Sequence, residues 1–358
     1  MNNTIPVELY AQPEQYKMLG MKPGTPEVWE DSLRTSGAQG EYEWWYFDSK
    51  LEGGGNLVIV FYTISPMDNQ NGGFAPYATL NLTLPDGTEI RDRLDPAEGD
   101  FSFAKDHCCV RIGQCLFEGD LHDYQIHYES EQVRADVKLH GNVPAWRTGT
   151  GHIFFGESDY FAWIPAVPEG SVQVSIVRDG NEESYTGTGY HDHNWGNIGM
   201  FVLMHHWYWG RCKVGDYQII SSYITAGPQY GYAHTPVFML AKGGEIISDT
   251  NVQPVYEETD LAFDEVTGKH YFKTLIYDYD DGRQHYRITY RMEEMLEQDV
   301  MIKQEAVRVA MMQQGLDPTY TRFSGTAVVE RLENGAVVEH VDAPALWELM
   351  YFGLDAQV

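Results

Sequence analysis

The stretch Gly187-Thr188-Gly189-Tyr190-His191-Asp192-His193-Asn194-Trp195-Gly196-Asn197 holds two imidazoles, a carboxylate, an amide, a phenol and an indole within six consecutive residues. Glycines on both sides of these six residues permit positive φ angles and close backbone approach. The alternation is typical of a β-strand, in which neighbouring side chains point to opposite faces of the sheet. The sequence therefore predicts a strand with two distinct faces, one carrying His191, His193 and Trp195 and the other Tyr190, Asp192 and Asn194.

The imidazole and indole face of this strand has the chemistry of an acid–base site. A histidine can donate a proton near neutral pH, and the face of an indole attracts positive charge. Two other interpretations stay open. A His-x-His pair can ligate a metal, but the sequence places no third ligand, so we predict no metal site. The stretch can also be a structural corner whose polar groups satisfy buried backbone amides.

Composition limits the kind of protein and its partners. The chain has 358 residues, 43% of them hydrophobic, which predicts two domains with substantial cores. Its formal net charge of −29 makes nucleic acid an unfavourable partner, because an acidic surface repels phosphate backbones. The first residues show no secretory signal, and no apolar run approaches the roughly 20 residues of a transmembrane helix. With no Cys-x-x-Cys among its four cysteines, we expect a reduced, cytoplasmic protein.

The pattern along the chain predicts an all-β fold with little helix. Many short runs of aromatic and β-branched residues are bounded by turn signals, which favours sandwiches or barrels. Asn334-Gly335 is the clearest type I′ turn, and residues 303–314 have the composition of a helix. We expect an N-terminal arm over residues 1–40, a first β domain over 41–215 and a second over 216–358. The predicted strands include 42–51, 57–65, 171–177, 183–190, 201–212, 217–226, 270–279, 284–292, 319–331 and 336–341.

Aromatic clusters elsewhere are candidates for the wall of a substrate cavity. On a strand, Trp44 and Tyr46 face one way while Trp45 and Phe47 face the other, so one side is expected to fill the core. Either side can equally be core alone, and Glu43 can be a buried acid or a solvated one. The candidate substrate-binding residues are Glu43, Trp44, Trp45, Tyr46, Tyr190, Trp207, Trp209, Tyr217 and Tyr223.

Four blocks of the sequence resemble the hydroxyneurosporene synthase (carotenoid hydratase) family. They are Glu43-Trp44-Trp45-Tyr46-Phe47-Asp48, Tyr190-His191-Asp192-His193-Asn194-Trp195-Gly196, Trp207-Tyr208-Trp209-Gly210 and Leu346-Trp347-Glu348-Leu349-Met350-Tyr351-Phe352-Gly353. The blocks occur in the order of the family, which also includes fungal kievitone hydratase and fungal cyclases that catalyse Diels–Alder reactions.

The resemblance implies two lipocalin-like β domains with a hydrophobic cavity between them. It carries over His193 and Trp195 as catalytic residues, with His191 and Asp192 adjacent. The sequence departs from the carotenoid hydratases at 217–223, where those enzymes have a Tyr and an Asp and this chain has no acid. Asp192 or a histidine is therefore left to supply the proton.

We predict a cofactor-free enzyme that hydrates an alkene or cyclises a hydrophobic terpenoid, polyene or polyketide-like substrate, acting as a lyase or isomerase of secondary metabolism. The phosphate-binding, nucleophile-elbow and His-Glu-x-x-His motifs are absent from the sequence. The alternative is a non-catalytic lipocalin-like carrier of a hydrophobic small molecule. A pocket imidazole predicts that a His193→Ala protein folds but does not turn over substrate.

Overall fold

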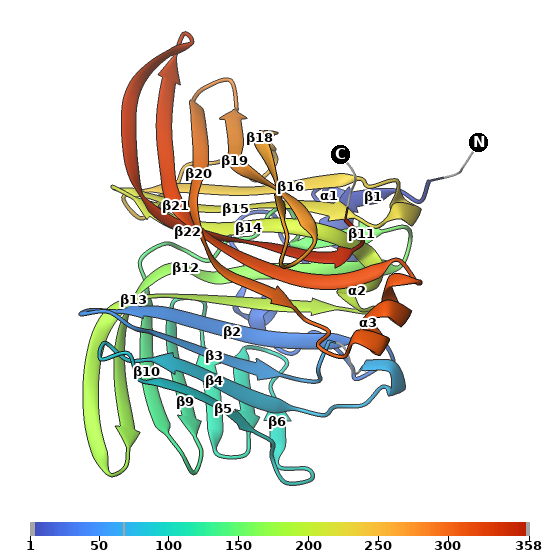
Figure 1. Ribbon diagram of the computed structural model, residues 1–358. Coiled ribbons are helices and arrows are strands. Elements are labelled where there is room, and N and C mark those ends of the chain that lie inside the picture. The colour runs from blue at the N-terminus through green and yellow to red at the C-terminus, as the bar shows by residue number, and fades with distance from the viewer. Residues whose placement is uncertain (1–3, 67–68, 356–358) are drawn as a thin grey trace. The chain divides into compact units, whose positions relative to one another are not determined.

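The computed structural model describes residues 4–66 and 69–355, and the chain divides into two compact units (Figure 1). The first unit is Tyr10–Met200, and the second combines Phe201–Val358 with Met1–Leu9. The division follows Met200, whereas the sequence placed the boundary near residue 215. Residues 1–3 of the predicted arm and residues 356–358 of the predicted second domain lie outside the described residues.

The first unit is built on one antiparallel sheet. Its strands follow the order β5-β4-β3-β2-β13-β12-β10-β9-β8-β7-β6, and β11 also pairs with β12. The short helices of this unit are α1 (Pro13–Met18), η1 (Val28–Asp31) and η2 (Asn69–Asn71). Its strands are β2 (Tyr42–Leu51), β3 (Asn56–Tyr62), β4 (Tyr77–Thr83), β5 (Glu89–Leu94), β6 (Phe101–Phe103), β7 (Cys108–Ile112), β8 (Cys115–Gly119), β9 (Asp123–Glu129), β10 (Arg134–Gly141), β11 (His152–Phe155), β12 (Asp159–Arg178) and β13 (Asn181–Gly196).

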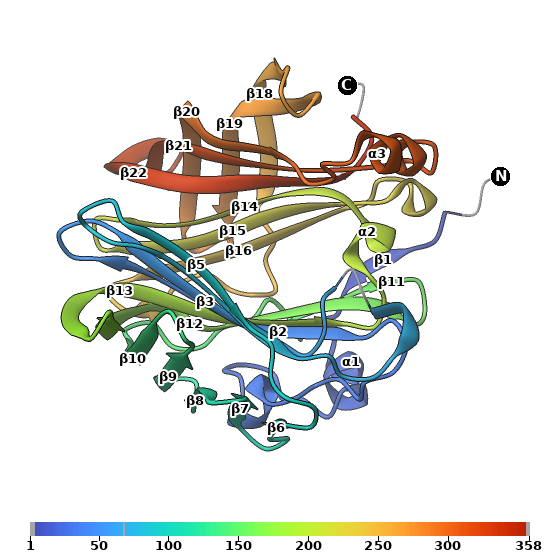
Figure 2. The same cartoon turned by 60° about the horizontal axis from the view of Figure 1, so that its bottom comes forward.

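This sheet curls until its two halves meet around a hydrophobic core, as Figure 2 shows for β2–β5 and β6–β10. Phe61 on β3 and Phe117 on β8 lie 5.6 Å apart between ring centroids, although several strands separate them in the sheet. The Tyr128 hydroxyl on β9 donates a 3.0 Å hydrogen bond to Asp92 on β5. Apolar and polar residues alternate along β10, so every second side chain is buried on the inner face of the curled sheet.

The second unit contains a 9-stranded antiparallel sheet of order β17-β16-β15-β14-β22-β21-β20-β19-β18. This sheet also curls. The curl brings Tyr223 on β15 against Tyr256 on β18, where the two rings stack with 3.7 Å between their centroids. The elements are β1 (Val7–Leu9), α2 (Met200–Leu203, at the junction of the units), β14 (Met204–Val214), β15 (Tyr217–Ala226), η3 (Pro228–Tyr230), β16 (His234–Lys242), β17 (Glu245–Ile246), β18 (Val255–Asp264), β19 (Lys269–Asp280), β20 (His285–Val300), α3 (Glu305–Met312), β21 (Leu316–Glu333) and β22 (Ala336–Gly353).

The all-β prediction is confirmed, and several elements match it closely. β2 and β15 have the predicted bounds, α3 lies within the predicted helix, and Asn334 and Gly335 have the positive φ angles of a type I′ turn. Several predicted strands differ from the structure in extent, as two examples show. The strand expected over 201–212 begins only at Met204, after the helical turn α2. The strand expected to end at residue 341 continues to Gly353 with Pro344 inside it, because the pairing with β21 continues through that position.

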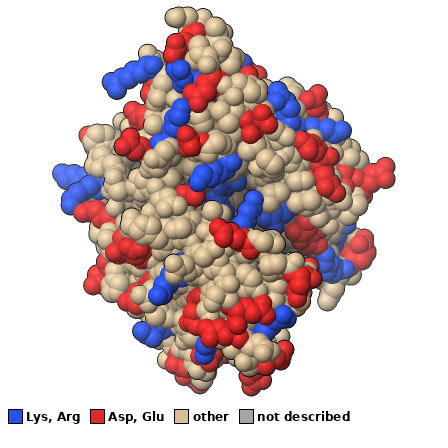
Figure 3. Space-filling view, turned by 90° about the vertical axis from the view of Figure 1, so that its left-hand side faces the viewer, with Lys and Arg blue, Asp and Glu red and all other residues tan. Residues whose placement is uncertain are grey.

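Acidic side chains are spread over the face shown in Figure 3, in keeping with the net charge of the chain. The four cysteines are free thiols. Within residues 4–66 and 69–355, no helix combines the length and the apolar character needed to cross a lipid bilayer.

Candidate functional site

β13 directs its two histidines into the core of the first unit. It pairs with β2 so that His193 lies opposite Trp45 and Trp195 opposite Glu43. The His193 ring stacks on Trp45 with 4.6 Å between centroids and lies 4.7 Å from the ring of Trp195. The side chains of His191 and His193 are both 0% exposed. The predicted strand is thus present, and its imidazole face points into the protein interior.

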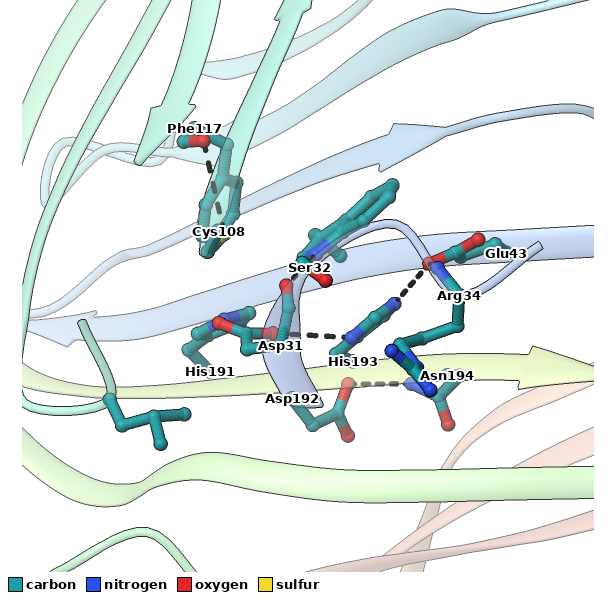
Figure 4. Close-up of polar contacts among 12 residues, drawn as sticks. Asp31, Ser32, Arg34, Glu43, Cys108, Phe117, His191, Asp192, His193 and Asn194 are labelled. Atoms are coloured by element: carbon teal, nitrogen blue, oxygen red, sulfur yellow. Dashed lines mark hydrogen bonds and ion pairs between the residues drawn. The ribbon is translucent and has the colours of Figure 1, made fainter. Parts of the chain in front are cut away.

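Asp31, the last residue of η1, lies between the two imidazoles (Figure 4). Its Oδ2 lies 3.2 Å from His191 Nε2 and accepts a 2.5 Å hydrogen bond from the Tyr124 hydroxyl. Its Oδ1 lies 3.2 Å from His193 Nδ1, the distance of an ion pair. The Nδ1 atom of His191 lies 2.9 Å from the carbonyl oxygen of Tyr46. A carbonyl oxygen only accepts, so this nitrogen carries a proton.

Glu43 holds His193 from the opposite side. Its Oε1 lies 2.7 Å from His193 Nε2 and accepts a 2.7 Å hydrogen bond from the backbone N–H of Arg34. Its Oε2 accepts hydrogen bonds from the N–H and the hydroxyl of Thr35, at 2.9 and 2.6 Å. Both ring nitrogens of His193 therefore face carboxylates. A protonated imidazolium suits this environment, because each of its nitrogens lies within ion-pair distance of a carboxylate.

The loop that carries Asp31 is fixed to the core by further buried bonds. Arg147 donates from Nε to Glu30 Oε2 at 2.6 Å, and both side chains are 2% exposed. Trp45 Nε1 donates a 3.0 Å hydrogen bond to the carbonyl oxygen of Asp31. The segment around η1 is thus part of the core of the first unit, and not a loosely attached arm.

The charges in this cluster stabilise one another. Burial on its own raises the pKa of Asp31, but His191 and His193 outweigh it and hold that pKa well below its usual value. Burial lowers the pKa of His193, and here the bonds to Asp31 and Glu43 prevail and raise it. Both shifts favour the buried ion pair between the Asp31 carboxylate and protonated His193.

The two shifts predict a stability optimum in mildly acidic solution. Asp31, with its lowered pKa, contributes stability above its unfolded value of about 3.9 and loses it as the pH falls through its folded value. His193, with its raised pKa, contributes stability below its unfolded value of about 6.5 and loses it as the pH rises through its folded value. We expect the melting temperature to be highest between about pH 4 and 6.5. A His193→Gln protein that keeps the same decline above pH 6.5 would contradict this assignment.

The opposite face of β13 carries Asp192 within a cradle of hydrogen-bond donors. Its Oδ2 accepts from the Tyr190 hydroxyl at 2.8 Å and from Trp163 Nε1 at 2.9 Å, and its Oδ1 accepts from Asn194 Nδ2 at 2.8 Å. Burial raises the pKa of Asp192, and these three donors oppose the shift without reversing it. Asp192 is 8% exposed, whereas His191 and His193 are 0% exposed. Asp192 therefore combines a raised pKa with limited exposure to solvent.

Aromatic residues of β2 lie beside Asp192. Tyr46 is opposite Asp192 in the strand pairing, and Trp44 is opposite Asn194. Both aromatic side chains are half-buried, and the Tyr46 ring meets the Tyr190 ring edge-on at 6.4 Å. Trp45 and Phe47, on the other face of β2, are fully buried in the core. This face therefore places a carboxyl group among π-systems, which attract cations.

The remaining predicted residues belong to the second unit. Trp207 and Trp209 on β14 are half-buried, and Trp207 packs edge-on against Phe352. Tyr217 lies in the core of that unit, and its hydroxyl accepts a 2.8 Å hydrogen bond from Lys242. Tyr223 is half-buried in a stack with Tyr256 and His234. The predicted residues of the first unit thus lie on the two faces of β13 and β2. The four predicted residues of the second unit lie on β14 and β15.

Sequence reasoning missed Asp31, Tyr124 and Trp163. Asp31 lies in a loop without periodicity, 160 residues from its partner His191, so no local spacing marks it. Trp163 is carried by β12, of which the sequence predicted only the later part. The pair Glu30-Asp31 was the available signal, because two acids beside Trp29 are unusual in a segment that becomes buried.

Asp31, Cys108 and His191 are the buried group in the described chain whose ligand atoms lie close enough to surround a metal ion, within 4.8 Å of one another. Burial, together with the charge of Asp31, raises the pKa of the Cys108 thiol well above its usual value. Cysteine binds metals as the thiolate, so a thiol that resists ionisation suits a hydrogen-bonded network better than a metal centre.

Comparison with known proteins places the chain in a family. Residues 117–335, more than half of the chain, match the Diels-Alderase-like family model. The chain belongs to the Diels-Alderase-like family. This confirms the resemblance seen in the sequence, since a hydroxyneurosporene dehydrogenase, a Diels-Alderase and kievitone hydratase are all among the matches.

Curated relatives of this Diels-Alderase-like chain are identical to it at about a quarter of the aligned positions. The quinolone epoxide rearrangement protein penF of Penicillium thymicola is 24% identical over 184 residues, 48% of this chain and 47% of that protein. The hydroxyneurosporene dehydrogenase of Chlorobaculum tepidum is 26% identical over 255 residues, 54% of this chain and 60% of that protein. The chain thus spans about half the length of the curated relatives it matches.

Solved structures share the fold over nearly the whole chain. CghA has a TM-score of 0.58 at 12% identity, covering 99% of this chain and 100% of its own. Kievitone hydratase from Nectria haematococca has a TM-score of 0.52 at 12% identity, covering 98% of each chain. A putative AttH from Nitrosomonas europaea has a TM-score of 0.55 at 15% identity, covering 96% of this chain and 98% of its own.

Proposed function

We propose that this protein is an enzyme of secondary metabolism that hydrates an alkene or cyclises a hydrophobic terpenoid, polyene or polyketide-like substrate, with Asp192 as the proton-bearing group. The observation that carries the proposal is the environment of Asp192. Burial raises its pKa, three donors fix its orientation, and Trp44 and Tyr46 lie on the same face. A fixed carboxyl group whose pKa is raised above its usual value keeps its proton to a higher pH, which favours a role as a general acid.

Asp192 is favoured over His193 because of access and hydrogen bonding. Both ring nitrogens of His193 are engaged by carboxylates, and its side chain is 0% exposed. A proton leaving His193 for a substrate would break a buried ion pair, which costs several kcal/mol. In this proposal His191, His193 and Trp195 are positioning residues that hold β13 in place, and the chemistry belongs to the opposite face.

In the hydration reaction, the Asp192 carboxyl group transfers its proton to one alkene carbon and leaves a tertiary cation on the other. The faces of Trp44 and Tyr46 stabilise this cation. The oxygen of a water molecule then bonds to the cation, and the proton that this water loses returns to the Asp192 carboxylate. The acid is regenerated, and the product is the substrate plus one water.

In the cyclisation reaction, Asp192 keeps its proton and donates a hydrogen bond to a carbonyl group conjugated with the reacting alkene. The hydrogen bond draws electron density from the alkene and lowers the barrier to ring closure, while the aromatic face holds the folded conformer. No atom is gained or lost, so the product is an isomer of the substrate.

Turnover of model substrates separates these reactions from simple binding. Purified protein is incubated with a linear polyene ending in a trisubstituted alkene and with a polyketide-like triene bearing an activated alkene. Mass spectrometry shows a gain of one water for hydration and an unchanged mass with a new retention time for cyclisation. We expect one of these products to form faster than in buffer. Recovery of both compounds bound but chemically unchanged would instead support a carrier.

A further inference from the structure

A pocket lies in the second unit, beside the N-terminal end of β14. Its volume is about 830 Å³, which suits a small organic ligand. Three histidines, His205, His206 and His234, line it together with the loop after η3 and the end of β22. All of the residues named for this pocket belong to the second unit, and none takes part in the chemistry proposed for Asp192.

A β-bulge brings two adjacent imidazoles into this pocket. Neighbouring residues on a regular strand point to opposite faces, yet the Nδ1 atoms of His205 and His206 lie 2.7 Å apart. The pairing of β14 with β15 passes from Met204–Ala226 to His206–Thr225, which leaves His205 unpaired. A bulge of this kind re-aims a side chain and is common beside binding sites.

The contacts of the two rings determine which nitrogen is left for a ligand. Burial lowers the pKa of His205, and a bond to the backbone at Leu354 opposes this shift, as expected when the ring donates a proton to a carbonyl. Neutral His205 therefore presents the lone pair of Nδ1 to His206, whose own Nδ1 carries a proton. The Nε2 atom of neutral His206 is then an acceptor, and no hydrogen bond to it occurs within the described parts of the chain.

His206 keeps this acceptor over a wide pH range. Burial, with a smaller contribution from the charges of His205 and His234, lowers its pKa to about 3. A neutral imidazole offers no positive charge to an anion, and the carboxylate of Asp355 on the same wall disfavours one. The pocket is therefore suited to a neutral ligand with a hydroxyl donor.

The rim of the pocket is apolar and partly strained. Val202, Tyr232 and Leu354 are 36%, 45% and 40% exposed, high values for large apolar side chains. Tyr232 has a φ of 55°, a left-handed conformation that is unfavourable for a bulky residue, and its ring meets His205 edge-on at 5.3 Å. Exposed apolar rims and residues in sparsely populated φ/ψ regions both concentrate at ligand sites.

We propose that this pocket is a second small-molecule site that binds a phenol. The aromatic ring packs against Tyr232, Val202 and Leu354, and the phenolic hydroxyl donates a hydrogen bond to Nε2 of His206. The site goes beyond the proposed reaction at Asp192 and is independent of it.

The test compares 1-naphthol with 1-methoxynaphthalene, which has the same ring system but cannot donate a hydrogen bond. Affinities are measured by calorimetry with the full-length protein. We expect 1-naphthol to bind about tenfold more tightly, the effect of one net hydrogen bond. The preference should persist at pH 5, because His206 is still neutral there.

Matched variants assign the binding to this pocket. His206→Phe keeps the ring that stacks on Tyr351 at 4.7 Å but removes the acceptor, so we expect it to abolish the preference for 1-naphthol. His340→Phe, at an exposed position on β22, and Asp192→Asn should both leave it unchanged. Equal binding of the two compounds to the wild-type protein, or a full preference in His206→Phe, would overturn the proposal. Loss of the preference in Asp192→Asn would also overturn it, by moving the phenol to the other site.

Discussion

Replacing Asp192 with Asn is expected to lower turnover about 10²–10⁴-fold, the usual contribution of a general acid, while the protein stays folded. Asn has the same shape and still accepts hydrogen bonds from Trp163 and Tyr190, but it cannot release a proton. The amide of Asn194 can rotate so that its oxygen accepts from the new side chain. Turnover and the thermal melt are measured on the same preparation, with the exposed Asp136→Asn as the control substitution.

The pH dependence of turnover gives an independent check on Asp192. The acid works in its protonated form, so wild-type activity is expected to fall as the pH rises through the raised pKa of Asp192. In Asp192→Asn this alkaline decline should disappear from the residual activity. Full turnover in the variant, with the wild-type pH profile, would remove Asp192 from the mechanism.

Replacing His193 with Ala is expected to destabilise the protein by about 3–5 kcal/mol, because Asp31 and Glu43 are left buried without their shared cation. The sequence alone favoured a folded, inactive variant, and the contacts of both ring nitrogens with carboxylates change that expectation. Urea denaturation gives the loss of stability. Turnover is then compared per folded molecule, so that unfolding is not mistaken for lost chemistry.

Two further variants make the His193 experiment specific. His140→Ala is the control, since His140 pairs with Asp123 at the surface and its loss should cost little. Adding Glu43→Gln to His193→Ala removes the buried Glu43 charge that faced His193, whereas Asp31 keeps His191, so the double variant should recover part of the stability. A His193→Ala protein as stable as wild type but without turnover would return the chemical role to the imidazole.

The fold was predictable where local patterns are strong. On β2 the alternation of Trp44 and Tyr46 with Trp45 and Phe47 separated a half-buried face from a core face before the structure was known. The same alternation separated the histidines of β13 from Asp192. It did not reveal which face enters the core, because both faces of this stretch are polar and both are buried.

The site was less predictable because its partners are distant in the sequence. Asp31 is a loop residue, and nothing in its neighbours indicates two histidines that follow 160 residues later. In the sequence, Tyr124 and Trp163 resemble ordinary core aromatics. Only the structure shows that they donate hydrogen bonds to the carboxylates of Asp31 and Asp192. Pro344 makes the extent of β22 hard to predict, since a proline often ends a strand and here lies inside one.

The burial of the segment around η1 has a consequence for biosynthesis. Glu30 and Asp31 leave the ribosome early, whereas Arg147 and His191 follow 117 and 160 residues later. At about 5–20 residues per second, Glu30 waits roughly 6–23 s for Arg147, and Asp31 waits roughly 8–32 s for His191. During translation this segment therefore lacks two of its buried partners until Arg147 and His191 have been synthesised. We expect a nascent chain that stops before residue 191 to expose this segment to proteases, and one that extends past Gly196 to protect it.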